Sequence, residues 1–202
     1  MSSVIKLTNI SKSFEEQKKI NILNKISYNF KKGKIYSLMG PSGSGKSTLL
    51  NLLSLIDRPS SGSISIENTI IDYKITNKND IIRAEKIGII YQQDNLLPDF
   101  TALENIYLPS LAAGNKKELS VIKAKTLLRK VGLSNRINHY PSQLSGGEKQ
   151  RVSIARAFVR PNLKAVFLDE PLTALSPKLK WQLRKKQKIL IFKMQEMHLI
   201  MG

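Results

Sequence analysis

The sequence contains no cysteine, which excludes a disulfide framework and any thiolate metal site and is compatible with a reducing cytosol. No apolar run approaches the roughly 18 residues that a membrane-spanning helix requires. The amino-terminal stretch MSSVIKLTNISKSF also lacks the apolar core of a signal peptide. We therefore expect a protein that is soluble or peripheral to a membrane, and a chain of 202 residues that forms one domain.

Acidic residues are scarce: 15 stand against 33 basic ones, so the formal net charge is +18. Such an excess is compatible with a polyanionic partner, either nucleic acid or anionic lipid. The alternative is a chain with lysine in excess over all its solvated faces. Segments such as NKKE and TNKND mix lysine with acids and amides, and aromatic residues do not alternate with the basic ones. This pattern favours scattered surface lysines, and it predicts no specific nucleic-acid partner.

Hydrophobic periodicity divides the chain into strands and helices in an α/β order. Alternation and short apolar runs predict strands at 4–10, 34–40, 63–67, 87–91 and 164–168, and longer segments predict helices at 46–56, 118–132 and 147–159. The helix at 118–132 should end at Gly132, and the residues expected along its apolar face are Leu119, Ile122, Leu127, Leu128 and Val131. There is no internal repeat or flexible linker. The economical interpretation is one α/β domain with a helical insertion.

The run GPSGSGKST lies between a predicted strand and a predicted helix, and it matches the phosphate-loop pattern G-x-x-x-x-G-K-[ST]. The backbone N–H groups of such a loop surround a phosphate chain, and the following helix N-terminus adds partial positive charge. Lys46 is expected to reach the β- and γ-phosphates, and the Ser47 hydroxyl to coordinate Mg²⁺. The predicted nucleotide-binding residues are Gly40, Pro41, Ser42, Gly43, Ser44, Gly45, Lys46, Ser47 and Thr48.

An acidic pair, Asp169-Glu170, follows the apolar run at 165–168. A carboxylate at the carboxyl end of a strand can hold a Mg²⁺ ion, and its neighbour can polarise the attacking water. Taken alone, the pair would serve equally well as a helix N-cap. The phosphate loop elsewhere in the chain favours the first interpretation, with Asp169 at the metal and Glu170 as the catalytic base.

The string LSGGEKQR at 144–151 offers a second anion site, because Ser145 supplies a hydroxyl while Gly146 and Gly147 expose backbone N–H groups before a predicted helix. This string resembles the signature motif of the ATP-binding cassette (ABC) transporter ATPases. The resemblance implies a head-to-tail homodimer, in which Ser145, Gly146 and Gly147 of one copy close over the γ-phosphate of the ATP held by the other. It covers residues 4–175 nearly without a gap.

The family's fold is implied with the motif. It is a P-loop NTPase of the ABC nucleotide-binding type, with an antiparallel β subdomain and a helical subdomain, here about 95–160, inserted between the glutamine loop (Q-loop) and the signature motif. Phe14 in SKSF matches the aromatic residue that stacks on adenine, although by itself it would as readily be a core phenylalanine. Gln92 matches the glutamine that contacts Mg²⁺ and the attacking water and senses the membrane partner, with Gln93 as a neighbouring alternative.

The segment NLLPDFTALENIYLP at 95–109 is similar to the lipoprotein-releasing branch of the family. That similarity implies two transmembrane permease subunits and a location at the cytoplasmic face of the inner membrane. ATP hydrolysis would then release lipoproteins towards the outer membrane. The alternatives are a macrolide- or peptide-type exporter, a nucleic-acid-associated ABC ATPase suggested by the charge, and a catalytically impaired relic.

The tail at about 177–202 departs from the family pattern and is predicted to be degenerate. Ser176 stands where the family has an aspartate on the dimer-facing loop, and His198 has no evident apolar strand leading into it, so the switch histidine is predicted to be missing. A truncated or frame-shifted carboxy terminus explains these departures, and a basic amphipathic helix is the alternative. The expected consequences are ATP binding with poor turnover, and an uncovered sheet edge where the terminal strands are missing.

Overall fold

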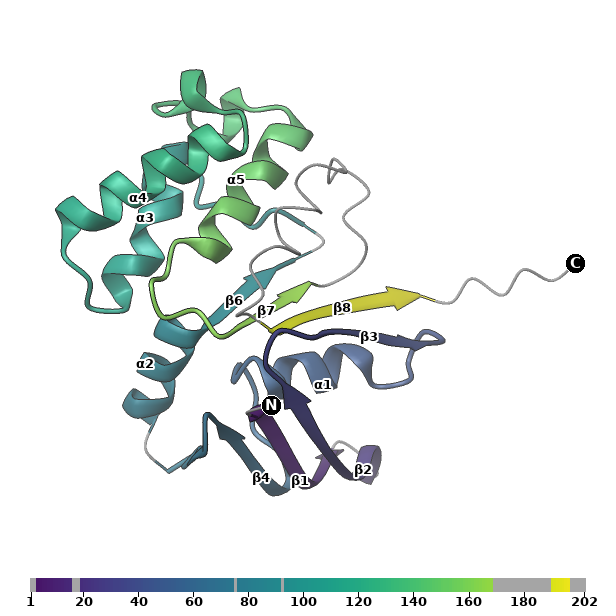
Figure 1. Cartoon of the computed structure of the whole chain (residues 1–202). Helices are drawn as coiled ribbons and strands as arrows, with labels where there is room; N and C mark the ends of the chain where they lie inside the picture. The colour runs from purple at the N-terminus through teal and green to yellow at the C-terminus, as the bar shows by residue number, and fades with distance from the viewer. Residues whose placement is uncertain (1–2, 16–18, 75, 92, 169–189, 197–202) are drawn as a thin grey trace, which may run out of the picture.

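Two four-stranded sheets organise the chain, with one helix between them, in a computed structural model that describes residues 3–15, 19–74, 76–91, 93–168 and 190–196 (Figure 1). The first sheet is antiparallel, in the order β2 (Lys19–Lys31), β1 (Ser3–Glu15), β4 (Ser61–Ile66), β5 (Thr69–Ile70). The second is parallel, in the order β3 (Ile35–Gly40), β8 (Leu190–Glu196), β7 (Ala165–Leu168), β6 (Ile87–Ile90). This arrangement confirms the α/β fold class and the antiparallel β subdomain.

The parallel sheet is covered on both faces, which explains the continuous apolar runs in β6 and β7. Alternate residues of β7 belong to different clusters: Ala165 and Phe167 pack with α1 (Lys46–Leu53), whereas Val166 and Leu168 pack with the helices on the opposite face. Because successive side chains of a strand point to opposite faces, the short run AVFL joins both cores. Because all strands of this sheet are parallel, the carboxyl ends of β3, β7 and β6 share one edge of the sheet.

Three helices between β6 and β7 build the second cluster, within the predicted helical subdomain. They are α3 (Ala102–Ala112), α4 (Lys117–Lys130) and α5 (Gly146–Phe158), with two short 3₁₀ turns, Ser134–Arg136 and Pro141–Gln143, between α4 and α5. A further helix, α2 (Thr76–Lys86), precedes β6, where the sequence pattern predicted no helix. Within the described residues, no helix is both long enough and apolar enough to cross a bilayer.

The predicted apolar face of α4 is wrong in its first turn. Leu119 and Ile122 are 64% and 63% exposed, while Ser120 and Ala124 are buried with Leu127, Leu128 and Val131. Small side chains at 120 and 124 let the helix approach its neighbours closely, and Ser120 Oγ donates a hydrogen bond to Ser110 Oγ at 2.9 Å. Apolar residues were thus a poor guide where small residues make the contact. The predicted stop is confirmed, because Gly132 has a φ of +75° directly after the helix.

The expectation that no strand precedes His198 is also wrong. β8 runs in parallel between β3 and β7, with Ile35 opposite Ile191 and Val166 opposite Ile191 on the other side. The run ILIF at 189–192 is a short continuous apolar segment, a pattern that is compatible with a strand and that has no amphipathic period. β8 therefore occupies the position between β3 and β7, and residues 190–196 are not an amphipathic helix. His198, Ser176 and the rest of 169–189 lie outside the described residues.

Candidate nucleotide-binding site

The phosphate loop connects the end of β3 at Gly40 to the start of α1 at Lys46, as predicted. Its backbone passes through the left-handed region at Gly43 and Gly45, with φ of +77° and +86°. Gly45 also lies against β2, since a Cβ there would be 3.0 Å from Ile22 Cγ2 and 3.1 Å from Leu23 Cδ2. Only glycine satisfies both the backbone angle and the close approach. The antiparallel sheet therefore supports the phosphate loop directly.

The N-terminus of α1 is open to an anion. Its N-cap residue is Gly45, no side chain caps it, and its first turn contains no acidic residue. The Lys46 Nζ donates hydrogen bonds to the carbonyl oxygens of Gly40 and Pro41, at 2.8 and 2.7 Å. The ammonium group is thus held over the loop by neutral acceptors, which a phosphate oxygen can replace with a stronger charge-assisted bond. Uncapped N–H groups, helix dipole and lysine together fit a polyphosphate.

The predicted magnesium and water-activating residues can be placed only in part. Ser47 lies in the first turn of α1, beside Lys46. Asp169, Glu170 and Gln92 lie outside the described residues. β7 nevertheless ends at Leu168 and β6 at Ile90, at the same edge of the parallel sheet as the phosphate loop. In open α/β sheets this carboxyl edge is where ligands bind.

Ser145 caps α5, the helix of the signature motif, through a reciprocal pair of hydrogen bonds. Its Oγ accepts from the Glu148 N–H at 3.3 Å, and Glu148 Oε2 accepts from the Ser145 N–H at 2.9 Å. The Arg136 guanidinium, which donates to Glu148 Oε1 at 2.9 Å, and the bonds from Ser145 lower the pKa of Glu148 to about 2. The carboxylate therefore stays ionised at neutral pH and holds the start of the helix in place.

Gly146 and Gly147 form the first turn of α5 and face open space. A Cβ at Gly146 would meet nothing within 4 Å, and one at Gly147 would meet only Arg151 Nη1, at 3.9 Å. The first N–H groups of a helix have no partner inside it, so this bare turn can donate hydrogen bonds to an external anion. Within one chain the two anion sites are separate, because α1 belongs to one core cluster and Leu144 and α5 to the other.

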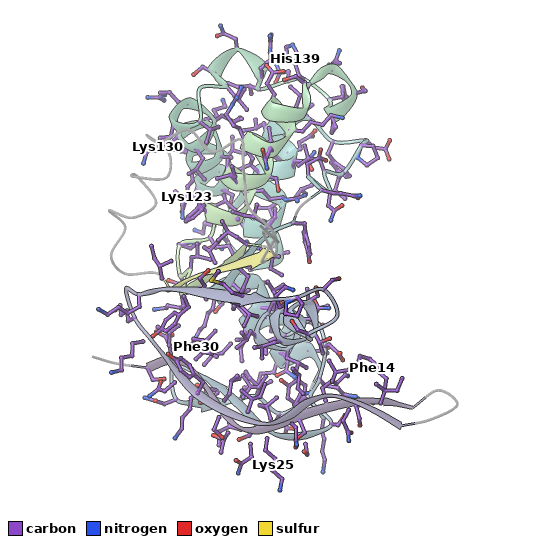
Figure 2. All side chains as sticks on the ribbon, turned by 90° about the vertical axis from the view of Figure 1, so that its right-hand side faces the viewer. Phe14, Lys25, Phe30, Lys123, Lys130 and His139 are labelled. Atoms are coloured by element: carbon purple, nitrogen blue, oxygen red, sulfur yellow. The ribbon has the colours of Figure 1, made fainter. Side chains whose placement is uncertain are left out.

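Phe14, the predicted base-stacking residue, is 45% exposed, which rules out the core interpretation. It lies at the end of the hairpin of β1 and β2, opposite Ile20 and far along the sheet from Phe30 (Figure 2). Lys12 Nζ lies 4.8 Å from the centre of its ring. The hairpin is the same one that contacts Gly45 through Ile22 and Leu23.

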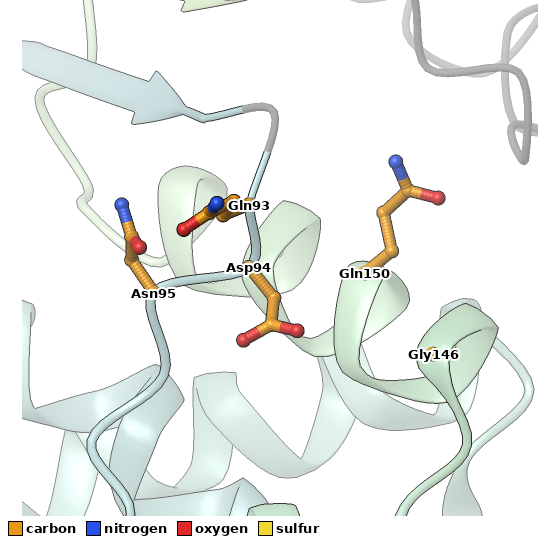
Figure 3. Close-up of a pocket in the computed structure, with 5 residues that line it drawn as sticks. All are labelled: Gln93, Asp94, Asn95, Gly146 and Gln150. Carbon is orange, nitrogen blue, oxygen red and sulfur yellow. The ribbon is translucent and has the colours of Figure 1, made fainter.

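A polar pocket of about 440 Å³ joins the segment after Gln92 to the signature helix (Figure 3). Gln93, Asp94 and Asn95 line one side, and Gly146 and Gln150 of α5 line the other. Arg156 Nη1 and Nη2 donate to the carbonyl oxygens of Asn95 and Asp94, at 2.7 and 2.8 Å. The segment that follows Gln92 is therefore in direct contact with α5.

A wider groove of about 660 Å³ lies between α2, β6, α3 and α5. Its apolar lining includes Leu97, Phe100, Leu108 and Pro109, and its basic lining includes Arg156 and Arg160. Burial, and to a lesser degree the nearby charge of Arg156, lower the pKa of Arg160 to about 10. Neither arginine was singled out from the sequence, because only the fold brings α5 to the segment at 94–101.

Asn105 stiffens the rim of this groove. The residue is 1% exposed, and its Nδ2 donates to the carbonyl oxygens of Leu97 and Phe100, at 3.0 and 2.8 Å. Its Oδ1 accepts from the Leu97 N–H at 2.8 Å. Leu97 and Phe100 are 45% and 38% exposed on a loop that is fixed by these bonds. A rigid apolar rim of this kind is typical of a docking surface.

Known proteins are similar to this chain over most of its length. The family model described as ABC transporter matches residues 23–173. The lipoprotein-releasing system ATP-binding protein LolD of Saccharophagus degradans is 44% identical over 169 residues, or 83% of this chain and 74% of that protein. The methionine import ATP-binding protein MetN of Streptococcus agalactiae is 42% identical over 179 residues, or 87% of this chain and 50% of that protein.

Among solved structures, the chain resembles the ATP-binding cassette MJ0796 in a dimeric, post-hydrolysis state bound to ADP and Pi. The TM-score is 0.84 at 34% identity, and the alignment covers 95% of this chain and 87% of that one. These likenesses confirm the ABC nucleotide-binding fold that the signature motif predicted.

Proposed function

Because the chain belongs to the ABC transporter family, we propose that it is the ATP-binding subunit of a transporter that releases lipoproteins from the inner membrane towards the outer membrane. The observation that carries the ATP-binding part is the uncapped N-terminus of α1 with Lys46 held over the phosphate loop. The similarity to LolD supports lipoprotein release as the work done. MetN has a comparable identity, so transport of a small solute is the second candidate.

Each copy would hold one ATP and Mg²⁺ through residues in distinct roles. The phosphate loop from Gly40 to Thr48 binds the phosphates, and Phe14 stacks on the base. Ser47, Asp169 and Gln92 would hold Mg²⁺, which neutralises charge on the β- and γ-phosphates. Glu170 would orient and polarise the attacking water.

Two copies would meet head to tail. The bare turn at Gly146 and Gly147, with Ser145 before it, then faces the γ-phosphate of the partner's ATP. The turn and the phosphate loop belong to different core clusters, which supports this arrangement because the two anion sites of one chain are separate. The dimeric structures of the similar cassette MJ0796 support the formation of a dimer.

Two membrane subunits would complete the transporter, with the ATP-binding subunits at the cytoplasmic face of the inner membrane. The groove beside Leu97 and Phe100 is the proposed docking surface, since it combines exposed apolar residues with a rigid loop. The same loop continues through Asn95 and Asp94 to Gln92, so docking of a membrane subunit would affect the residue proposed to contact Mg²⁺ and the attacking water. We propose no specific nucleic-acid partner, because scattered lysines provide salt-sensitive attraction without base readout.

Crosslinking tests the docking surface. A photoreactive residue at Phe100 should capture a membrane subunit in intact cells, because Phe100 lies on the exposed rim of the groove. The matched control is Ile70, which is 67% exposed on the antiparallel sheet and should give no such product. Capture from positions in the tail and not from Phe100 would contradict the assignment.

Reconstitution tests the cargo. The chain, placed in liposomes with the membrane subunits found by crosslinking, should show ATPase activity that rises several-fold with an acylated lipoprotein. It should not rise with the same protein lacking its acyl chains. Stimulation by methionine or by another small solute, with no response to lipoprotein, would replace lipoprotein release with the second candidate.

A further inference from the structure

Lys12 is a buried cation on β1 whose contacts are more elaborate than strand pairing requires. The residue is 9% exposed, and its Nζ donates to Asp57 Oδ1 at 2.8 Å and to the Arg58 carbonyl oxygen at 2.9 Å. The second carboxylate oxygen of Asp57 is also 2.8 Å away. Burying a lysine ammonium is costly unless it is paired and hydrogen-bonded, and here both conditions are met. The ammonium therefore has a well-defined position.

That position is over the ring of Phe14, with 4.8 Å between Nζ and the ring centre. Lys12 and Phe14 are two residues apart on β1, and this contact places their side chains together although the pairing of β1 with β2 shifts register between Lys12 and Ser13. A cation at this distance from an aromatic ring is attracted to its π face, more strongly when the cation is removed from water. The contact holds the ring while leaving Phe14 45% exposed for another planar group.

Lys12 also contacts two residues, Asp57 and Leu23, that connect the aromatic ring with the phosphate loop. Asp57 follows α1, the helix that starts at the loop, and its N–H donates to the Asn51 carbonyl oxygen of that helix at 3.2 Å. On the strand side, Lys12 is paired with Leu23, the residue that contacts Gly45. The distance between the loop and the aromatic ring is thus set on both sides by residues that contact Lys12.

We propose that Lys12, held by Asp57, is a positioning residue that fixes Phe14 at the separation from the phosphate loop that ATP requires. The inference rests on the proposed function, because it takes Phe14 as the platform for the base. It adds a specific claim: the lysine contributes to base affinity through Phe14 and not through the phosphates. A purely structural ion pair between β1 and the turn after α1 would make no such distinction.

A double-mutant cycle on ATP binding separates these two roles. Titration calorimetry with Mg-ATP would compare the unmodified chain with Lys12→Met, Phe14→Ala and the double variant. Methionine keeps the apolar stem of the side chain and removes the ammonium. Lys12→Met should weaken ATP binding about three- to tenfold, as expected for loss of a partly desolvated cation–π contact. In the Phe14→Ala background the same change should have an effect below about twofold.

Matched controls keep the result interpretable. Lys86→Met removes another lysine ion pair, to Glu67 at 3.0 Å, and should leave ATP affinity unchanged. Asp57→Asn preserves the shape of the side chain that holds Lys12 but removes its charge, and it should cause a smaller, Phe14-dependent loss of ATP affinity. This variant replaces Lys12→Met as the test if Lys12→Met fails to fold. Binding of inorganic tripolyphosphate, which lacks a base, should be the same in every Lys12 and Asp57 variant that folds.

Each outcome decides a separate question. If Phe14→Ala weakens binding but the effect of Lys12→Met or Asp57→Asn is equal in both backgrounds, Lys12 is structural only and the inference is overturned. If Phe14→Ala does not change ATP affinity, Phe14 does not stack on the base, and the inference about Lys12 is overturned as well. The proposed ATP site itself is then judged independently by the Lys46 variant.

Discussion

Replacement of Lys46 with alanine is expected to weaken Mg-ATP binding by about 10- to 100-fold, from the micromolar-to-millimolar affinity expected of the unmodified chain. Lys46 Nζ lies over the loop, bound only to neutral carbonyl oxygens of Gly40 and Pro41. On binding, it would exchange these for charge-assisted bonds to the β- and γ-phosphates, which contribute about 1.5–3 kcal/mol. Titration calorimetry measures the loss directly.

The control for this experiment is Lys74→Ala, which removes an equal charge from an exposed loop. It should leave the affinity unchanged, since general electrostatic attraction is weak at physiological salt. Circular dichroism would establish that both variants are folded. An unchanged affinity in Lys46→Ala would mean that residues 40–48 are not the nucleotide site.

Steady-state ATP hydrolysis by the 202-residue chain is expected to be about 100-fold slower than by LolD of Saccharophagus degradans, a loss of about 3 kcal/mol in barrier. Hydrolysis needs a positioned water, a base and charge stabilisation around the γ-phosphate, and such groups act as a unit. Glu170, Gln92 and Lys46 are expected to supply part of this unit. The loss is expected because Ser176 stands where the family has an aspartate and because His198 is not expected to act as the switch.

β8 makes His198 the residue to test. The strand ends at Glu196, opposite Gly40 at the start of the phosphate loop, and His198 follows two residues later in the sequence. Glu170→Gln should abolish the residual activity, because it removes the base. His198→Ala should leave that activity unchanged if the switch is missing. Unmodified turnover equal to that of the relative would show that His198 or another residue serves as the switch, and a tenfold or greater loss in His198→Ala would identify His198.

The site motifs were the most predictable part of the molecule, because each is contiguous and its chemistry is local. The phosphate loop and the bare turn at Gly146 and Gly147 need only backbone conformation and short-range bonds, and the structure has both, whereas the cap that Ser145 makes was not predicted. The first turn of α4 was mispredicted for the opposite reason. Whether Leu119 or Ser120 faces the core depends on how closely α3 approaches, which no local pattern contains.

The sequence by itself determined the α/β class and the phosphate loop, because glycines and a lysine at set spacings dictate local backbone and charge, and the resemblance of the string at 144–151 indicated the family. Only the tertiary structure decided that β8 lies between β3 and β7 and that Arg156 meets the segment after Gln92. It also decided that Lys12 bridges Asp57 and Phe14. These contacts join residues such as Lys12 and Asp57, or Asn95 and Arg156, that are distant in the chain. Their pairing depends on how whole sheets and helices pack, since burial of the shared core selects which distant residues meet.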